Sequence, residues 1–267
     1  MELKQPAITP FPGFMDCLKR TLKRYAERPF VFVVIGLTAS LIPAVILFLG
    51  LFPAILGTRP GQLDFISSPM IQLSTTLLMT ILAAPFYTAL GYAASRPATL
   101  PTALRRGFSL ALTWLLAYTL TGLALLLPSL LLFPGAVMGV HLSLLMPVVV
   151  NEKLTGFIAM RRSADLIRGR FLKILLSLII FVFLASVISL SMSLAPQSVL
   201  SSLAGLVVSS AIIAPLLFIF LQILYEDLKA EKKDIPTAPR GYRYHKILAG
   251  IGLILIVLLS TAINRTL

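Results

Sequence analysis

Long apolar runs separated by short charged segments dominate the chain. A helix needs about 20 apolar residues to cross the hydrocarbon core of a membrane. Seven runs approach or exceed that length: 30–57, 70–94, 108–127, 129–150, 171–195, 199–225 and 247–263. They contain no Asp, Glu or Arg, and their only Lys, Lys173, lies near a membrane face. The pattern predicts an all-α polytopic transmembrane helical bundle of about seven spans, six plus one at the C-terminal end.

The distribution of charge decides whether residues 108–150 cross once or twice, since only Pro128 and a short polar break interrupt them. With two crossings and a cytoplasmic N-terminus, 21 of the 23 Lys and Arg lie inside, shared 6, 3, 6 and 6 among segments 1–29, 95–107, 151–173 and 226–246. One crossing would place 10 inside and 13 outside. Because Lys and Arg accumulate on the cytoplasmic side, we expect seven spans and an outer C-terminus.

This topology divides the chain into four parts. They are a basic cytoplasmic amphipathic segment 1–29, a six-span domain 30–225 with an interfacial helix 154–170, a charged cytoplasmic linker 226–246, and a seventh span with a short outer tail 247–267. Pro236 and Pro239 interrupt the linker, and its four acids and six bases predict a solvated loop.

Two cytoplasmic segments have the periodicity of amphipathic helices, which lie in the headgroup plane with their basic side toward lipid phosphates. In the first, Phe14, Leu18 and Leu22 recur every fourth residue. In the second, apolar residues alternate at three and four: Phe157, Met160, Ala164, Ile167 and Phe171. We expect both segments to be cytoplasmic interfacial helices.

A five-residue pattern, small–apolar–basic–Arg–small, occurs three times, at 17–21, 103–107 and 159–163. Each copy precedes a pair of spans. The spacing indicates three repeats of an interfacial helix followed by a transmembrane hairpin. Basic residues are expected before a span in any case, so the alternative of no true repeat stays open.

The net charge of +13 also fits nucleic-acid binding, because basic patches neutralise phosphates. Here, however, the bases lie between membrane-length apolar runs. The anions predicted as partners are therefore lipid headgroups on the cytoplasmic face, at roughly 1 kcal/mol per basic side chain near the surface. A membrane-protein partner is compatible with the same surface, whereas a nucleic acid is not predicted.

The predicted spans lack the groups that membrane enzymes and ion-coupled transporters use. They hold no carboxylate, no HExxH motif occurs, and no carboxylate cluster is suited to Mg²⁺. No catalytic residue, metal site or cofactor is predicted. The polar side chains at depth are Gln72, Tyr87 and His141, which we expect to make interhelical hydrogen bonds. Gly135 and Gly139 predict close approach of a helix from this chain or from a second copy.

The exit from the fourth run reads as an apolar span with Pro147, then Glu152, then Gly-Phe-Ile-Ala-Met-Arg-Arg-Ser over 156–163, then Arg-Gly-Arg-Phe over 168–171. This stretch resembles an uncharacterised bacterial multi-pass inner-membrane family that includes the membrane domain fused to some glycerophosphoryl diester phosphodiesterases. The resemblance implies a bacterial cytoplasmic membrane and a fold of usually six spans, from which the run 247–263 departs. It implies no phosphodiesterase activity, because the chain has no such domain.

The polar residues of this stretch form either a structural clamp or a lipid-headgroup site: Glu152, Arg161, Arg162, Ser163, Arg168 and Arg170. Asp165 is one helical turn from several of these bases and is expected to pair with one of them. The sequence favours a non-enzymatic membrane protein, acting in envelope or lipid homeostasis or as a scaffold. The alternative is a transporter or flippase of a lipid or amphipathic solute, with His141 and the proline-kinked spans lining its path.

Overall fold

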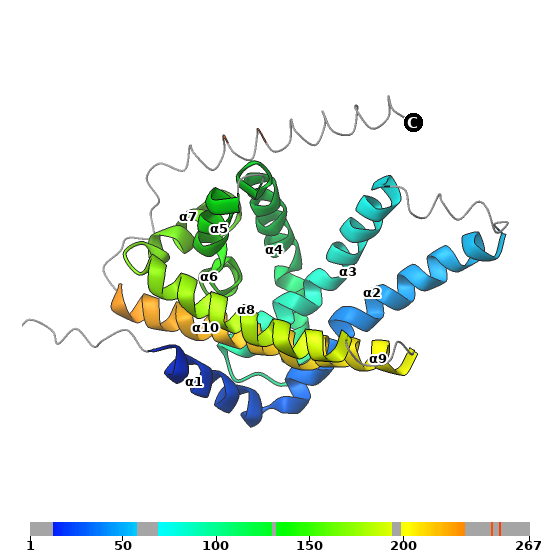
Figure 1. Cartoon of the computed structure of the whole chain (residues 1–267), viewed down its shortest axis with the longest axis horizontal. Coiled ribbons are helices and arrows are strands. Elements are labelled where there is room, and N and C mark those ends of the chain that lie inside the picture. The colour runs from blue at the N-terminus through cyan, green and yellow to red at the C-terminus, as the bar shows by residue number, and fades with distance from the viewer. Residues whose placement is uncertain are drawn as a thin grey trace, which may run out of the picture.

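The computed structural model describes residues 13–57, 69–129, 132–193 and 199–232, with positions 247 and 251 in isolation. Every element in these ranges is a helix (Figure 1). In chain order they are α1 (Phe14–Glu27), α2 (Pro29–Gly57), α3 (Pro69–Ser95), α4 (Leu100–Ser129), α5 (Leu132–Leu142), α6 (Leu145–Glu152), α7 (Gly156–Ile167), α8 (Phe171–Ser193), α9 (Val199–Val208), the π-helix η2 (Ser209–Ile213) and α10 (Ala214–Glu231).

Six helical stretches in the described part are long and apolar enough to cross a membrane. They are Pro29–Leu47, Ser74–Ser95, Leu100–Leu126, Pro134–Glu152, Phe171–Ser191 and Ala204–Glu231. Residues 108–150 are divided between two of these stretches, in agreement with the expectation from charge. The predicted seventh span, 247–263, lies outside the described residues apart from positions 247 and 251.

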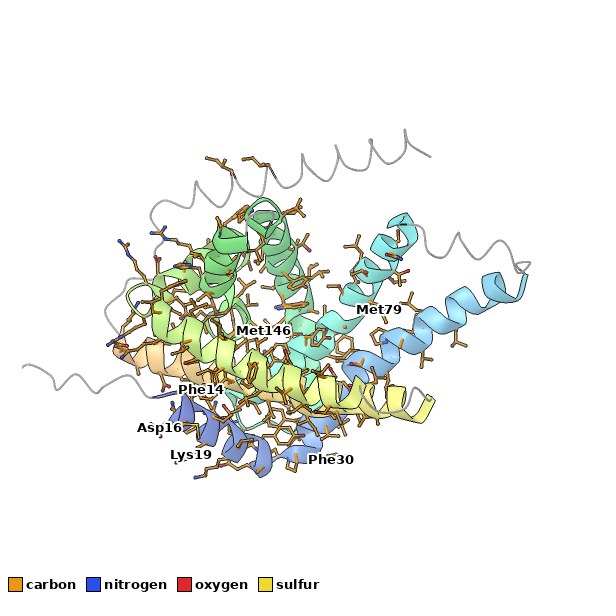
Figure 2. The ribbon with its side chains drawn as sticks, in the orientation of Figure 1. Phe14, Asp16, Lys19, Phe30, Met79 and Met146 are labelled. Atoms are coloured by element: carbon orange, nitrogen blue, oxygen red, sulfur yellow. The ribbon has the colours of Figure 1, made fainter. Side chains whose placement is uncertain are left out.

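Large apolar side chains are exposed along the outer face of α8, where Leu172, Phe183 and Leu190 are 74%, 65% and 60% accessible. An apolar surface of this kind is unfavourable in water and favourable against lipid. Figure 2 shows two contrasting side chains: the apolar Met146 is buried among the helices, whereas the charged Lys19 projects outward from α1. The described fold is therefore that of a helical, multi-pass membrane protein.

Two of the predicted spans are interrupted. The fourth, expected as one helix over 129–150, is divided into α5 and α6 by a turn at Ser143 and Leu144. The sixth is formed by α9 and α10, joined through the five-residue π-helix η2. An ideal Cβ placed on Gly36 of α2 would lie 2.1 Å from the carbonyl oxygen of Ser210, so α2 packs against η2 at a distance that only glycine permits.

The best-packed region surrounds α6, α7 and α10. Residues Leu145 to Val150 of α6 are all buried, and α6 contacts α3, α4, α7 and α10. The helix α1 packs against α10, with the rings of Phe14 and Phe220 5.9 Å apart at their centroids. This arrangement packs α1, α6 and α7 against α10.

The three copies of the five-residue pattern share one structural property. Their first and last residues are buried in every copy: Cys17 and Thr21, Ala103 and Gly107, Ala159 and Ser163. The four-residue spacing of these small side chains places them on one helix face, which packs inward. The second copy, however, lies within α4 and has no interfacial helix of its own. Its place in three structural repeats stays a prediction.

Candidate functional site

The turn between α6 and α7 places a carboxylate beside a guanidinium. Glu152 is the last residue of α6, and Lys153 closes the helix in the left-handed conformation (φ 54°). The chain then reverses into α7, where Arg162 Nε lies 2.9 Å from Glu152 Oε2. The two side chains are only 8% and 7% exposed. Of the six residues predicted as a clamp, the structure joins these two directly.

A third helix completes the surroundings of Glu152. The hydroxyl of Tyr225, on α10, donates a hydrogen bond of 2.8 Å to Glu152 Oε1. Lys229 Nζ lies 3.5 Å from the same oxygen and donates to the Tyr225 hydroxyl at 2.9 Å. We call Glu152, Arg162 and Tyr225 the buried clamp, which the exposed side chain of Lys229 flanks. It ties α6, α7 and α10 together, and both carboxylate oxygens of Glu152 have partners.

The other predicted clamp residues have separate partners. Arg161 Nε is 3.1 Å from Asp165 within α7, and Arg170 pairs with Glu231 at the end of α10. Ser163 is buried and donates to the carbonyl of His141 at 2.7 Å, which fastens α7 to α5. Arg168 is exposed, and its carbonyl accepts a hydrogen bond from Lys232. The structure thus distributes these residues among several contacts instead of gathering them in one headgroup site.

The prediction of a solvated loop from residue 226 is wrong for 226–231, because α10 continues as a helix through Glu231. Its acids face other helices: Glu226 makes two hydrogen bonds of 3.0 and 2.9 Å to Arg24, and Asp227 pairs with Arg20. Gln222 receives a 3.0 Å bond from Asn151 and donates one of 3.0 Å to Glu226. Leu228 in this segment is fully buried. The helical periodicity of apolar residues continues past residue 225, and this was the signal for a longer helix.

Among the groups beside this network and outside the predicted spans, Cys17 and Lys232 have pKa values that burial shifts. Burial raises the pKa of the Cys17 thiol, and the nearby Asp227 carboxylate adds to the effect, against the opposing influence of Arg20. Burial lowers the pKa of Lys232, which donates to the carbonyls of Asp165 and Arg168. Both shifts reflect the close packing at the end of α10.

Among the residues predicted at depth, His141 and Tyr87 make contacts other than the expected interhelical hydrogen bonds of their side chains. His141 Nδ1 is 2.8 Å from the carbonyl of Val137 in its own helix, and its ring stacks on Phe171 at 5.2 Å. Tyr87 contacts neighbouring helices through its ring, which stacks on Phe218 at 5.9 Å. Gln72 is exposed near the start of α3.

The glycines of α5 are the remaining predicted site residues. A Cβ on Gly139 would meet no described atom within 4 Å, so the expected close helix contact within the chain is wrong at this position. Gly135 is half-buried in the same helix. A contact with a second copy at these two glycines stays a prediction.

A basic groove lies beside the buried clamp, on the other side of the α6 terminus. Two adjoining hollows of about 610 and 120 Å³ share Arg106 and Ser109 in their walls. Arg105 lines the larger hollow, while Arg96 and Lys153 line the smaller. We call Arg96, Arg105, Arg106 and Lys153 the basic groove. Sequence reasoning included these bases in the charge count but had no signal that they converge.

The groups that converge here suit anion binding better than metal binding. Over the ranges that the structure describes, no three His, Cys, Asp or Glu side chains come together as metal ligands would. Comparisons of the chain with known protein families, with curated proteins and with solved structures find no match. The class that the fold defines is a multi-pass helical membrane protein, in which a buried clamp and a basic groove meet at the same ends of the helices.

Proposed function

We propose that the protein is a non-enzymatic integral protein of the bacterial cytoplasmic membrane that holds anionic lipid at its cytoplasmic face. In this role it supports envelope or lipid homeostasis, or scaffolds a membrane-protein partner. The N-terminus is cytoplasmic in this proposal, as the charge distribution favours. The same charge asymmetry agrees with the sequence resemblance to a bacterial inner-membrane family.

The observation that carries the proposal is the surplus of unpaired bases. The described residues contain 16 Lys and Arg but only seven Asp and Glu, and five of those acids are already in ion pairs: Glu152, Asp165, Glu226, Asp227 and Glu231. Within the same ranges, nine bases have neither an ion pair nor a hydrogen bond through the side chain: Lys19, Lys23, Arg28, Arg96, Arg105, Arg106, Lys153, Arg168 and Lys173. Anionic headgroups supply the missing charge.

The buried clamp supports a structural role for the one deeply placed carboxylate. Glu152 accepts from Arg162 and Tyr225 and lies near Lys229, so protein donors hold both of its oxygens. A general acid or base needs a position within hydrogen-bond reach of its substrate, whereas this side chain is only 7% exposed. The geometry therefore favours binding and scaffolding over catalysis.

The test is lipid retention by the full chain. Protein extracted in a mild detergent is mixed with equal amounts of phosphatidylglycerol and phosphatidylcholine, and bound lipid is counted by native mass spectrometry. We expect phosphatidylglycerol to be retained preferentially, and the preference to weaken in high salt, because exposed charges are screened there. Equal retention of the two lipids at low salt would remove the basis of the proposal.

A second function, a transporter or flippase without an intramembrane carboxylate relay, is supported by the two interrupted spans. Interrupted helices are typical of transporter substrate sites, and π-helices occur frequently at functional sites. Ser143, at the break between α5 and α6, has a buried hydroxyl without a hydrogen-bond partner among the described residues. Lipid scrambling by the chain reconstituted in vesicles tests this function, and an unchanged scrambling rate relative to empty vesicles would reject it.

A further inference from the structure

Four bases from three separate helix ends meet in the basic groove. Arg96 follows the last residue of the candidate span Ser74–Ser95, and Lys153 follows the last residue of Pro134–Glu152. Arg105 and Arg106 lie in the first two turns of α4. Arg96 and Lys153 are therefore at the depth where a span leaves the hydrocarbon, and Arg105 and Arg106 line the adjoining hollows.

Within the described residues, no ion pair compensates the charge in this groove. All four side chains belong to exposed residues, and none has an ion pair in the part of the chain that the structure describes. Arg96 also lines a further hollow of about 250 Å³ together with Glu27, Arg24 and Arg28. The two hollows of the groove itself have no carboxylate among their described lining residues.

The backbone at Lys153 provides an independent observation. Lys153 is the one non-glycine residue with positive φ in the described ranges. The left-handed conformation costs roughly 1–2 kcal/mol for most residues, and Gly or Asn normally occupies it at helix ends. Such strain is typical of positions where the side chain has a function. Here the left-handed residue is a lysine whose side chain lines the groove.

The remaining lining fits a phosphate ester with an apolar part. The Tyr92 hydroxyl lines the smaller hollow, and Leu110 and Val150 bring apolar surface. Ser109 and Asn151 also line it, but their donors are already bonded to protein acceptors. Arginine guanidinium groups bind phosphate oxygens in pairs of parallel hydrogen bonds. A phosphate in the groove would therefore have two or more charged donors, with the Tyr92 hydroxyl beside them and apolar walls next to the glycerol and acyl groups.

We propose that the basic groove is a binding site for the phosphate of a phosphate ester, supplied either by the headgroup of an anionic phospholipid or by a soluble glycerol phosphate. The proposal deepens the proposed function, and it rests on that function for the lipid source alone. The groove binds the phosphate between Arg105 and Arg106 of α4 and Lys153 at the end of α6, with Arg96 lining the same hollow as Lys153.

The experiment measures binding of three probes to the full chain in detergent: short-chain phosphatidylglycerol, glycerol 3-phosphate and short-chain phosphatidylcholine. The test variant is R105Q/R106Q, and the matched control R161Q/R170Q removes the same charge from two bases that already pair with Asp165 and Glu231. Each base near the membrane surface is worth about a fivefold change in affinity. We expect R105Q/R106Q to weaken phosphatidylglycerol binding by about 25-fold, and the control to weaken it by less than about threefold.

The variant K153N separates binding from folding. Asparagine tolerates the left-handed conformation better than lysine does, so we expect an unchanged or higher melting temperature together with about fivefold weaker phosphate binding. If K153N and R105Q/R106Q both retain wild-type affinity for phosphatidylglycerol and glycerol 3-phosphate, the site assignment is overturned. A general misfolding of R105Q/R106Q cannot produce this outcome, because K153N gives an independent reading.

The probes also distinguish the two sources and the two proposals. Binding of phosphatidylglycerol much tighter than glycerol 3-phosphate assigns the site to a lipid, and similar affinities assign it to a soluble ester. If wild-type protein shows no preference for anionic over zwitterionic lipid, the proposed function fails. In that case the site still stands if glycerol 3-phosphate binds and R105Q/R106Q abolishes the binding, and it is overturned if glycerol 3-phosphate does not bind.

Discussion

Arg162 and Glu152 form a buried ion pair across the turn between α6 and α7, with Nε and Oε2 2.9 Å apart. Ten residues of chain separate them, and the turn that joins them contains the left-handed residues Lys153 and Gly156. The hydroxyl of Tyr225 on α10 donates a hydrogen bond to the same carboxylate, so three helices are held together at this pair. Its contribution to stability is the first quantity to measure.

We expect R162A to destabilise the protein by about 3–5 kcal/mol, because it leaves the Glu152 carboxylate buried without its main partner. The matched control is R161A, the neighbouring arginine, whose pair with Asp165 is partly exposed and worth about 0.3–0.5 kcal/mol. Denaturant or thermal unfolding in detergent measures both. Similar losses in the two variants would contradict the assignment of Glu152 and Arg162 as a clamp.

The hydroxyl of Tyr225 gives a finer test of the same cluster. Y225F keeps the buried ring and removes the 2.8 Å hydrogen bond to Glu152, which is a bond to a charged group. We expect a loss of about 1.5–3 kcal/mol in the free energy of unfolding. The combination of Y225F with R162A should be less than additive, because both changes act on one carboxylate. Full additivity would show that the two contacts are independent.

Local sequence signals account for part of this site. The stretch that resembles a bacterial membrane family indicated Glu152 and Arg162. Residue periodicity predicted a helix over 154–170, where the structure has α7 at Gly156–Ile167. Tyr225 lies 73 residues from Glu152, and no spacing rule connects an apolar run's last tyrosine with a carboxylate on another helix. The same reason explains why the pairing of Arg24 with Glu226, 202 residues apart, escaped prediction. Such contacts depend on the order in which helices pack, which the positions of the spans alone leave open.

The fold was easier to predict from the sequence than the candidate site was. Apolar length and charge count separated α4 from α5 and α6, because each of those signals is additive along the chain. The break at Ser143 and the π-helix at Ser209–Ile213 were not predicted. The π-helix was missed because it depends on a contact between helices. The carbonyl of Ser210 in the π-helix lies against Gly36 of α2, which is distant in the sequence.

Gly107 offers a test of helix packing. An ideal Cβ on Gly107 would lie 2.3 Å from the Pro85 carbonyl oxygen and 2.7 Å from the Ala89 nitrogen, both backbone atoms. We expect G107A to force α3 and α4 apart, to disturb the 2.8 Å bond from Thr88 to the Gly107 carbonyl, and to cost about 1–3 kcal/mol. The control G122A lies in the same helix, where a Cβ meets no atom within 4 Å. It should unfold at the wild-type temperature or slightly above it, and an equal loss in both variants would contradict the close packing.

Cys17 reports on the contact between α1 and α10 through its reactivity. Burial raises the pKa of its thiol, so less thiolate is present at neutral pH than for an exposed cysteine, and the thiolate is the species that maleimides attack. The control is A26C in a C17S background, which places an exposed thiol on the same helix. We expect wild-type labelling to be at least about tenfold slower than labelling of the control at neutral pH.

The folded state binds this proton more tightly than the unfolded state, so the associated stability is present at neutral pH and is lost as the pH rises through the raised pKa. Labelling of Cys17 should therefore accelerate at a higher pH than labelling of the control. Identical pH profiles for the two thiols would show that α1 does not pack against α10.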